Sequence, residues 1–425
     1  TSIYVADSDN HRIRRIDIAT GEVTTFAGSG SPDWQDGNGI NARFHYPHGI
    51  TTDGINLYVT DANNNRIRQI EISTGDVETI AGNNNYGDID GTGSSASFHY
   101  PTGITTDGTN LYVVDTNNHK IRKVVISSGV VTSIAGKGGG YYGYGYQDGP
   151  GVDARFNSPH SITTDGTNLY VADSGNNRIR KIDIATKEVF TIAGDGDYNS
   201  YDGNGINSGI NYPKGIATDG ANLYVAETNG HKIRQIDLST LDVTTLAGSG
   251  TYSSSDGSGT EASFKSPVGI TIEGSDMYVV ESDGYVIRKI SSRTTATAGL
   301  SLHNLDDDTD VTVSLSSSDE GEAVVTPATL TFTEDNWDTA QAVTVTGIDD
   351  DDTDGNKAYK VSLSAANVLT SVPEVTTFAG SGSYGYQDGF GTEADFSYLQ
   401  GGVTSDGTSI YVADSDNHRI RRIDI

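Results

Sequence analysis

A repeated five-residue segment is the feature that most limits how this chain can fold. Segments such as LYVAD begin at residues 3, 57, 111, 169, 223, 277 and 410. The first six copies follow one another at intervals of 54 or 58 residues, and the last interval is 133 residues. A strand-rich repeat of roughly 40–50 residues is typical of a β-propeller, in which each repeat forms a four-stranded blade.

The composition of the repeats favours strands joined by tight turns. The chain has 52 Gly and 23 Tyr among 425 residues, with frequent Asn, Asp, Ser and Thr, and no segment has a convincing helical pattern. The unit at 101–140 divides into four predicted strands, which are Gly103–Thr106, Asn110–Asp115, Lys120–Ile126 and Val130–Ala135. The first two are short and apolar, as expected beside a central channel.

The two ends of the chain share one sequence, since residues 1–18 are identical to residues 408–425. We expect a six-bladed ring in which the strand at 402–405 pairs with the strands within 3–28 to complete one blade. The second hairpin, 410–425, would then compete for the same blade, belong to the next copy of a 407-residue repeat, or insert into a neighbouring molecule as a donated hairpin. A seven-bladed ring is the alternative.

A segment without the repeat interrupts the sixth unit. Alternating apolar residues such as Val311, Val313 and Leu315 predict sandwich strands with one buried face. The sequence therefore predicts an all-β chain with three parts: propeller blades at 1–292, a small β-sandwich insertion at 293–373, and the last propeller strands at 374–425.

Two family resemblances rest on these residues. The pattern P-x-G-I-x-x-D-G-x-x-L-Y-V-x-D-x-x-N-x-x-I-R-x-I resembles the NHL-repeat β-propellers, and QDGPGVDARFNSPH at 147–160 is similar to the linkers of secreted prokaryotic members. Within the insertion, TPATLTFTEDNWDTAQAVTVTGIDDD resembles part of a Calx-β-like or related immunoglobulin-like domain. The first resemblance implies a scaffold that hosts many functions, some of them lyases or hydrolases with a metal at the channel mouth.

The charge of the chain excludes several classes of partner. With 27 Lys and Arg against 57 Asp and Glu, the formal net charge is −30, so the chain should repel nucleic acids and anionic membranes. The absence of Cys excludes disulfides and thiolate metal sites. No apolar stretch approaches the roughly 20 residues of a membrane-spanning helix.

Acidic loops of the insertion are the candidate metal site. Calcium prefers six to eight hard oxygen ligands, several of them carboxylates. If the two loops share one pole of the sandwich, as the Calx-β resemblance implies, they would bind Ca²⁺, and no organic cofactor is expected. The candidate ligands are Asp306, Asp307, Asp308, Asp349, Asp350 and Asp351.

An acid and an arginine recur seven residues apart in every repeat. Because a functional residue seldom appears once per blade, we interpret these pairs as structural ion pairs within each hairpin. The pairs are Asp7/Arg14, Asp61/Arg68, Asp115/Arg122, Asp173/Arg180, Glu227/Arg234, Glu281/Arg288 and Asp414/Arg421.

Two histidines carry the argument for an enzyme. His48 and His160 each follow the proline that opens a blade, where the other repeats have Thr102, Lys214, Val268 and Gln400. Two imidazoles do not complete a three-ligand catalytic metal site, so we predict no catalytic residues and no enzyme. The remaining repeat histidines, His11, His119, His231 and His418, fall in turns, where a structural role is expected.

Aromatic side chains concentrate in the glycine-rich linkers between blades. Exposed tyrosine on such loops suits sugar stacking or protein contact, although it can also pack against its own linker. The candidate contact residues are Trp34, Tyr141, Tyr142, Tyr144, Tyr146, Tyr384 and Tyr386.

Together these features predict an extracellular or cell-surface structural and binding module of prokaryotic type. Its expected partners are other copies of itself, or a cell-surface protein or glycan, through the loops and the duplicated hairpin. Adhesion or head-to-tail assembly would be its role. A propeller lyase or hydrolase with a metal at the channel mouth is the alternative.

Overall fold

The structure is a computed structural model of the 425-residue chain. It describes residues 2–7, 11–17, 23–138, 143–273, 276–300, 311–314, 323–326, 329–332, 341–347, 368–379, 381–383, 399–405, 409–414 and 419–424. Two compact units are separate in it, residues 1–290 with 375–425 and residues 291–374.

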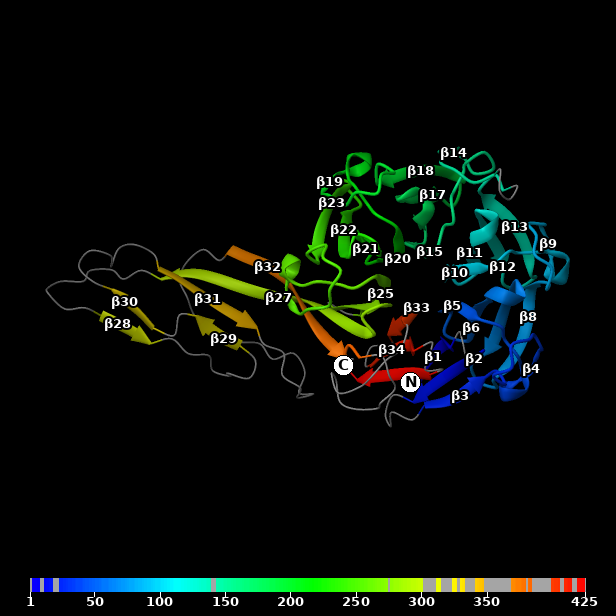
Figure 1. Cartoon of the computed structure of the whole chain (residues 1–425), viewed down its shortest axis with the longest axis horizontal. Helices are drawn as coiled ribbons and strands as arrows, with labels where there is room; N and C mark the ends of the chain where they lie inside the picture. Colours follow the sequence, from blue (N-terminus) through cyan, green and yellow to red (C-terminus); the bar gives the residue numbers. More distant parts are fainter. Residues whose placement is uncertain are drawn as a thin grey trace. The chain divides into compact units, whose positions relative to one another are not determined.

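Five blades of four long antiparallel strands follow one another around the first unit (Figure 1). The first blade consists of β5 (Pro47–Thr52), β6 (Asn56–Asp61), β7 (Arg66–Glu71) and β8 (Asp76–Gly82). The second consists of β10 (Pro101–Thr106), β11 (Asn110–Asp115), β12 (Lys120–Val125) and β13 (Val130–Ala135). The third consists of β15 (Ser161–Thr164), β16 (Asn168–Asp173), β17 (Arg178–Asp183) and β18 (Glu188–Ala193). Blades four and five are β20 (Pro213–Thr218), β21 (Asn222–Glu227), β22 (Lys232–Asp237) and β23 (Asp242–Ala247), then β25 (Pro267–Glu273), β26 (Asp276–Glu281), β27 (Val286–Leu300) and β32 (Val368–Ala379).

Each linker adds a short fifth strand to the outer edge of the blade that it enters. These strands are β4 (Gly37–Asn38), β9 (Gly91–Thr92), β14 (Gly149–Pro150), β19 (Gly203–Asn204) and β24 (Gly257–Ser258). Single turns of 3₁₀ helix lie in the linkers and in the turns between the second and third strands: η1 (Gly39–Asn41), η2 (Ala62–Asn64), η3 (Gly93–Ser95), η4 (Thr116–Asn118), η6 (Ser174–Asn176), η7 (Gly205–Asn207) and η8 (Gly259–Glu261). Among the described residues, no helix is long and apolar enough to cross a membrane.

The strand prediction for the second blade is close to the structure. β11 and β13 have the predicted bounds, β10 begins two residues earlier at Pro101, and β12 ends one residue earlier at Val125. The turn between β10 and β11 explains this accuracy, because the Asp107 carboxylate accepts hydrogen bonds from the backbone N–H of Thr109 and Asn110 and from the Tyr112 hydroxyl. Such an Asx turn is encoded locally.

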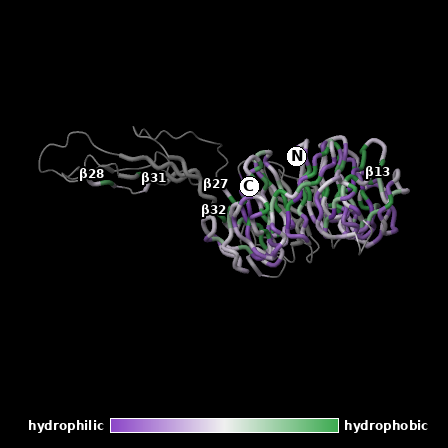
Figure 2. The backbone as a smooth tube through the Cα atoms, turned by 90° about the horizontal axis from the view of Figure 1, so that it is seen from above, coloured by the Kyte–Doolittle hydropathy of each residue, from purple (hydrophilic) through white to green (hydrophobic). Residues whose placement is uncertain are grey.

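The hydrophobic core lies between neighbouring blades. One cluster joins Tyr112 and Ile121 of the second blade to Ile162 and Leu169 of the third. Hydrophobic and hydrophilic residues are interleaved throughout the blades (Figure 2), as expected when strands alternate their side chains between two faces. Each blade therefore depends on its neighbour for burial.

A buried arginine ties each described blade to its own linker. Arg122 donates to Asp115 at 2.8 Å and to Asp90 of the linker at 2.7 Å, and its guanidinium lies 5.0 Å from the ring centroid of Phe98. The interpretation of the recurrent pairs as structural ion pairs is confirmed in five blades: Asp61/Arg68, Asp115/Arg122, Asp173/Arg180, Glu227/Arg234 and Glu281/Arg288. The pairs at the chain ends, Asp7/Arg14 and Asp414/Arg421, involve side chains outside those described.

A second repeated contact fastens one blade to the next. A residue in left-handed conformation after the 3₁₀ turn accepts a hydrogen bond from the backbone N–H that precedes the next blade. His119, with φ of 56°, accepts from Ser158 through Nδ1 at 2.9 Å. Asn65 accepts in the same way from Tyr100 at 2.8 Å. The turn histidines His11 and His231 make the same contact, so the structural role predicted for them is confirmed.

Two neighbouring positions alternate from blade to blade. The left-handed residue and the one after it are Asn65 and Arg66, His119 and Lys120, Asn177 and Arg178, and His231 and Lys232 in the first four blades. The arginines lie over linker aromatic rings, with Arg66 at 3.7 Å from the Trp34 centroid and Arg178 at 3.8 Å from that of Tyr146. In the second blade Lys120 instead pairs with Asp88 at 2.8 Å.

The predicted number of blades is wrong, both as six and as the alternative of seven, because the described chain forms five blades of four long strands. The chain ends do not share a blade: β1 (Ser2–Asp7), β2 (Arg12–Asp17) and β3 (Val23–Ala27) form one three-stranded sheet, and β33 (Leu399–Ser405), β34 (Ser409–Asp414) and β35 (Arg419–Asp424) form another. β33 pairs with β34, its neighbour along the chain. Closing that short loop costs far less entropy than pairing across the whole chain.

The second unit contains four further short strands. They are β28 (Val311–Ser314), β29 (Ala323–Thr326), β30 (Thr329–Phe332) and β31 (Gln341–Gly347). β28 pairs with β30, while β31 pairs with β29 and with residues 295–300 of β27. The acidic residues predicted to bind calcium, Asp306–Asp308 and Asp349–Asp351, lie outside the described residues.

Candidate functional site at the channel mouth

The first strand of each blade lines the central channel, and its start marks one face of the propeller. The antiparallel register places Pro101 opposite Asp115, so the start of β10 lies beside the turn between β11 and β12. These innermost strands run close together. A Cβ atom on Gly103 would lie 2.8 Å from the Cα of Ser161, and one on Gly215 would lie 2.9 Å from the carbonyl oxygen of Val268. The glycines therefore keep the channel narrow.

A cavity of about 120 Å³ opens among the starts of these strands. Equivalent positions of five blades contribute His48, Thr102, His160, Lys214 and Val268 to its wall. One strand period deeper, two residues further along each chain segment, the wall is aliphatic, with Ile50, Ile104, Ile216 and Ile270. The cavity thus has a polar mouth above an apolar throat.

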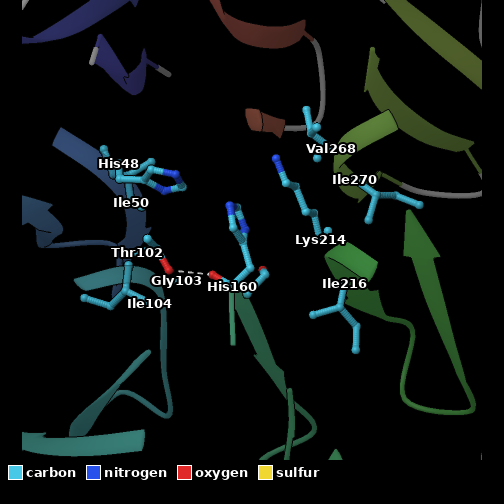
Figure 3. Close-up of a pocket in the computed structure, with 14 residues that line it drawn as sticks. His48, Ile50, Thr102, Gly103, Ile104, His160, Lys214, Ile216, Val268 and Ile270 are labelled. Atoms are coloured by element: carbon cyan, nitrogen blue, oxygen red, sulfur yellow. Dashed lines mark hydrogen bonds between the residues drawn. The ribbon is translucent and has the colours of Figure 1, made fainter. Parts of the chain in front are cut away.

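The polar side chains of the mouth converge. Figure 3 shows the imidazoles of His48 and His160 and the amine end of Lys214 directed into the same space. The two imidazole rings meet edge to face, with centroids 5.2 Å apart and planes at 72°. Thr102 points its hydroxyl away from this group, donating at 2.7 Å to the backbone carbonyl of His160. That bond fixes the backbone on which His160 sits.

The electrostatics of the mouth favour neutral imidazoles. Burial in the channel and, as the smaller cause, the nearby Lys214 amine together lower the pKa of His48 to about 4. The pKa of His160 is also lowered by burial and by both neighbours. Burial lowers the pKa of Lys214, while Asp283 opposes this shift. At neutral pH the mouth therefore holds one ammonium and two uncharged rings.

No carboxylate lies among the residues that line this cavity. All three of its titratable groups are bases, and none of them has a hydrogen bond or ion pair to another described side chain. Among the described residues, no three His, Asp or Glu side chains gather into a metal-ligand cluster. The donor set is suited to a negatively charged group, which an ammonium and imidazole N–H groups can bind.

Exposed aromatic rings lie on the same face as the mouth, because the histidines that they contact lie in the turns between second and third strands or just before a first strand. Tyr86 is 76% exposed, Tyr252 is 54% exposed and Tyr144 is 38% exposed. Each stands beside a histidine of a turn or linker: the ring centroids are 5.3 Å apart for Tyr86 and His99, 5.2 Å for Tyr252 and His231, and 5.5 Å for Tyr144 and His119. A notch between the first two blades, lined by Tyr86, His99, Tyr100 and three asparagines, adds a cavity of about 180 Å³.

The predicted contact residues divide into three groups. Trp34 and Tyr146 pack against Arg66 and Arg178, as the alternative of packing on the framework anticipates, and each keeps about two-fifths to one-half of its surface exposed (38% and 47%). Tyr144 belongs to the exposed aromatic rim. Tyr141, Tyr142, Tyr384 and Tyr386 lie outside the described residues.

Sequence reasoning missed Lys214 as a site residue. It occupies the position equivalent to His48 and His160, so the same alignment that identified the histidines contained the signal. Tyr86 and Tyr252 were missed as well, because neither lies in a tyrosine-rich linker. Only the structure shows that these rings and the channel mouth share one face.

Comparison with known proteins supports an NHL-repeat β-propeller. The NHL repeat model matches residues 156–182, which form the first part of the third blade. A crystal structure of a protein of unknown function from Bacteroides thetaiotaomicron has 17% sequence identity and a TM-score of 0.51, and the match covers 97% of this chain and 81% of that one. At this identity the likeness concerns the fold alone.

Two curated proteins are similar in sequence. Protein SUPPRESSOR OF QUENCHING 1, chloroplastic, from Arabidopsis thaliana is 32% identical over 252 residues, which covers 56% of this chain and 24% of that protein. NHL repeat-containing protein 2 from Homo sapiens is 30% identical over 279 residues, which covers 57% of this chain and 38% of that protein. The chain thus spans less than two-fifths of the length of these relatives.

Proposed function

We propose that this NHL-repeat β-propeller is a binding module that recognises its partner with the face around the channel mouth. The observation that carries the proposal is the placement of exposed Tyr86, Tyr144 and Tyr252 around a mouth of unpaired bases. Tyrosine supplies a large contact area with a polar tip at low entropic cost. The similarity to NHL repeat-containing proteins is consistent with an interaction module.

The opposite face supports this choice of surface by contrast. Its turns between first and second strands carry Asp53, Asp107, Asp165 and Asp219, and each carboxylate accepts two backbone N–H bonds and one tyrosine hydroxyl. These groups are engaged in the turns themselves. A partner on that face would find these four carboxylates already hydrogen-bonded.

The partner proposed is a cell-surface protein or glycan, or another copy of the chain, and the proposed setting is extracellular. The formal net charge of −30 supports solubility and argues against anionic partners that rely on long-range attraction. Assembly between copies is supported by the two terminal sheets, each of which has three described strands where a blade has four. A strand edge of this kind can pair with another chain.

For the inserted unit we retain the proposal of a Calx-β-like domain that binds calcium through its acidic loops. Its support is the sequence alone. A chelator that leaves the melting temperature of that unit unchanged would contradict it. A lyase or hydrolase function is the second candidate, favoured by the meeting of His48 and His160 at 5.2 Å. We rank it lower because the lining of the cavity pairs these imidazoles with an amine rather than with a third metal ligand or a carboxylate.

The experiment compares the adhesion of a triple variant of the aromatic rim with that of a double control variant. Fluorescently labelled full chain is bound to intact bacterial cells, with sedimentation velocity as a second readout for association between copies. We expect Tyr86→Ser, Tyr144→Ser and Tyr252→Ser together to reduce binding at least tenfold. The matched control, Ile55→Ser with Phe190→Ser, also removes exposed apolar surface, but outside the rim, and should bind as the parent does. Loss of binding in the control alone would contradict the assignment of the face.

A further inference from the structure

We propose that the channel mouth binds the carboxylate of a small aliphatic acid, with the charged end between Lys214, His48 and His160 and the apolar end in the throat. This inference rests on the proposed function, because it places a small-ligand subsite at the centre of the binding face. It also extends that function, because nothing in the aromatic rim requires a charged ligand.

The charge of the ligand follows from the groups in the mouth. At neutral pH the lowered pKa values leave the two imidazoles uncharged, so Lys214 is the single cation in the cavity wall. One ammonium balances one negative charge, which is the charge of a carboxylate. A dianion such as sulfate would bring a second charge that no group in the wall balances. The neutral rings can still donate their N–H groups to the carboxylate oxygens.

The groups around Lys214 do not already satisfy its charge. Asp283 favours the charged form of Lys214, but the two form no ion pair, and Asp283 accepts hydrogen bonds from the hydroxyls of Tyr252 and Ser266. The Lys214 amine lies 5.8 Å from the ring centroid of Tyr212, which is a weak cation–π contact. A ligand carboxylate would therefore be the close partner of this ammonium.

The apolar half of the ligand follows from the throat. Ile50, Ile104, Ile216 and Ile270 stand at equivalent positions of four blades and line the deeper wall. The volume of about 120 Å³ sets an upper limit of a few carbon atoms beyond the carboxylate. Because each buried CH₂ contributes about 0.8 kcal/mol, each added carbon that fits should raise affinity roughly fourfold.

The test titrates the full chain with acetate, propionate, butyrate and valerate at pH 7 by calorimetry and by NMR of ¹⁵N-labelled histidine rings. We expect saturable binding that strengthens from acetate to butyrate, with shifts of the His48 and His160 ring resonances. 1-Butanol and sulfate should bind at least tenfold more weakly than butyrate. Sulfate that binds as tightly as butyrate would overturn the carboxylate assignment.

Variants identify the residues. Lys214→Gln should weaken butyrate binding at least tenfold, and Ile216→Thr should flatten the dependence on chain length while leaving acetate unchanged. Lys181→Gln removes a lysine from the middle of β17, outside the cavity lining, and should bind butyrate as the parent does. Equal affinity of Lys214→Gln and the parent would overturn the proposal.

Three further outcomes separate this subsite from its alternatives. If Zn²⁺ binds the chain through His48 and His160, and butyrate binds only after the metal, the carboxylate ligand belongs to a metal site and the proposal is wrong. If no aliphatic acid binds while the Tyr86, Tyr144 and Tyr252 variant still loses adhesion, the subsite fails and the binding function stands. If the Tyr86, Tyr144 and Tyr252 variant keeps its adhesion while butyrate binds normally, the binding function of the rim is contradicted instead.

Discussion

The buried arginine sites and the channel mouth are both built from one position per blade, yet they differ in how completely their charges are paired. Arg122 has carboxylates on both sides at 2.7 and 2.8 Å and two backbone carbonyls as further acceptors. In the mouth, equivalent positions carry His48, Thr102, His160, Lys214 and Val268, and the bases have no acidic partner in the cavity wall.

The difference indicates that a charged residue repeated in every blade has a structural role. A charged residue found in only a few blades at an equivalent position marks the candidate binding site. A charge that recurs in every blade is desolvated and must be balanced where it stands, or each blade would lose stability. A base that appears in a few blades only, at a position where others have Thr or Val, is not required by the blade. The following predictions test this comparison from the largest expected effect to the smallest.

The largest effect should come from breaking a repeated charge pair. Asp115→Ala leaves the Arg122 guanidinium with one partner fewer in a fully buried site, so we expect the free energy of unfolding to fall by about 3–5 kcal/mol. Asp90→Ala, which removes the half-exposed carboxylate on the other side of the same guanidinium, should cost about 1 kcal/mol. Guanidinium chloride unfolding followed by circular dichroism measures both. Equal costs would show that burial does not distinguish the two partners.

A smaller effect should come from the contact that fastens one blade to the next. His119→Ala removes the acceptor for the Ser158 N–H, and alanine adopts the left-handed region less readily than Asn or His, so we expect a loss of about 2 kcal/mol. His119→Asn should remain within about 0.5 kcal/mol of the parent, because Asn65 and Asn177 already make this contact. Glycine adopts the left-handed conformation without strain, so His119→Gly measures the loss of the hydrogen-bond acceptor alone. If Asn proves as damaging as Ala, the hydrogen bond is not what this position supplies.

The effect that is smallest at neutral pH should come from the channel mouth, because it appears only as the pH falls. The pKa of His48 is lowered by burial to about 4 in the folded chain, below its usual value of 6.5, so the unfolded chain binds more protons between these pH values. The contribution of His48 to stability is therefore complete above pH 6.5 and is lost as the pH falls toward 4. Unfolding of the parent and of His48→Asn, at pH 7.5, 6.0 and 4.5, gives the difference between them. We expect the free energy of unfolding of the parent minus that of the variant to decrease as the pH falls. An increase would contradict the burial of this imidazole.

The features of this fold that could be predicted from the sequence are those determined by residues close together in the chain. The bounds of β11 and β13 followed from turns such as that at Asp107, and the recurrent acid and arginine were correctly interpreted as structural pairs. The number of blades could not be predicted by counting strands. Identical hairpins at the two ends made a shared blade and two separate sheets equally consistent with the sequence, and the short loop before β34 decided between them.

The candidate site was less predictable from the sequence, because it forms only when the blades are arranged in a ring. His48, His160 and Lys214 are separated by more than 50 residues from one another, and only the ring brings them into one cavity. The histidines drew attention as possible metal ligands by residue type. With Lys214 beside them, the histidines form a set of donors suited to an anion, and no local sequence pattern predicts this grouping.

The alternation of Asn65–Arg66, His119–Lys120, Asn177–Arg178 and His231–Lys232 limits which of the first four blades can replace one another. In the first and third blades the arginine lies over an aromatic ring of its linker, Trp34 or Tyr146, whereas in the second Lys120 pairs with Asp88 of its linker. The fifth blade has Tyr285 and Val286 at these positions, so the alternation ends with the fourth. A chimera that moves a blade together with its own linker should therefore preserve contacts that an exchange of the blade alone would mismatch.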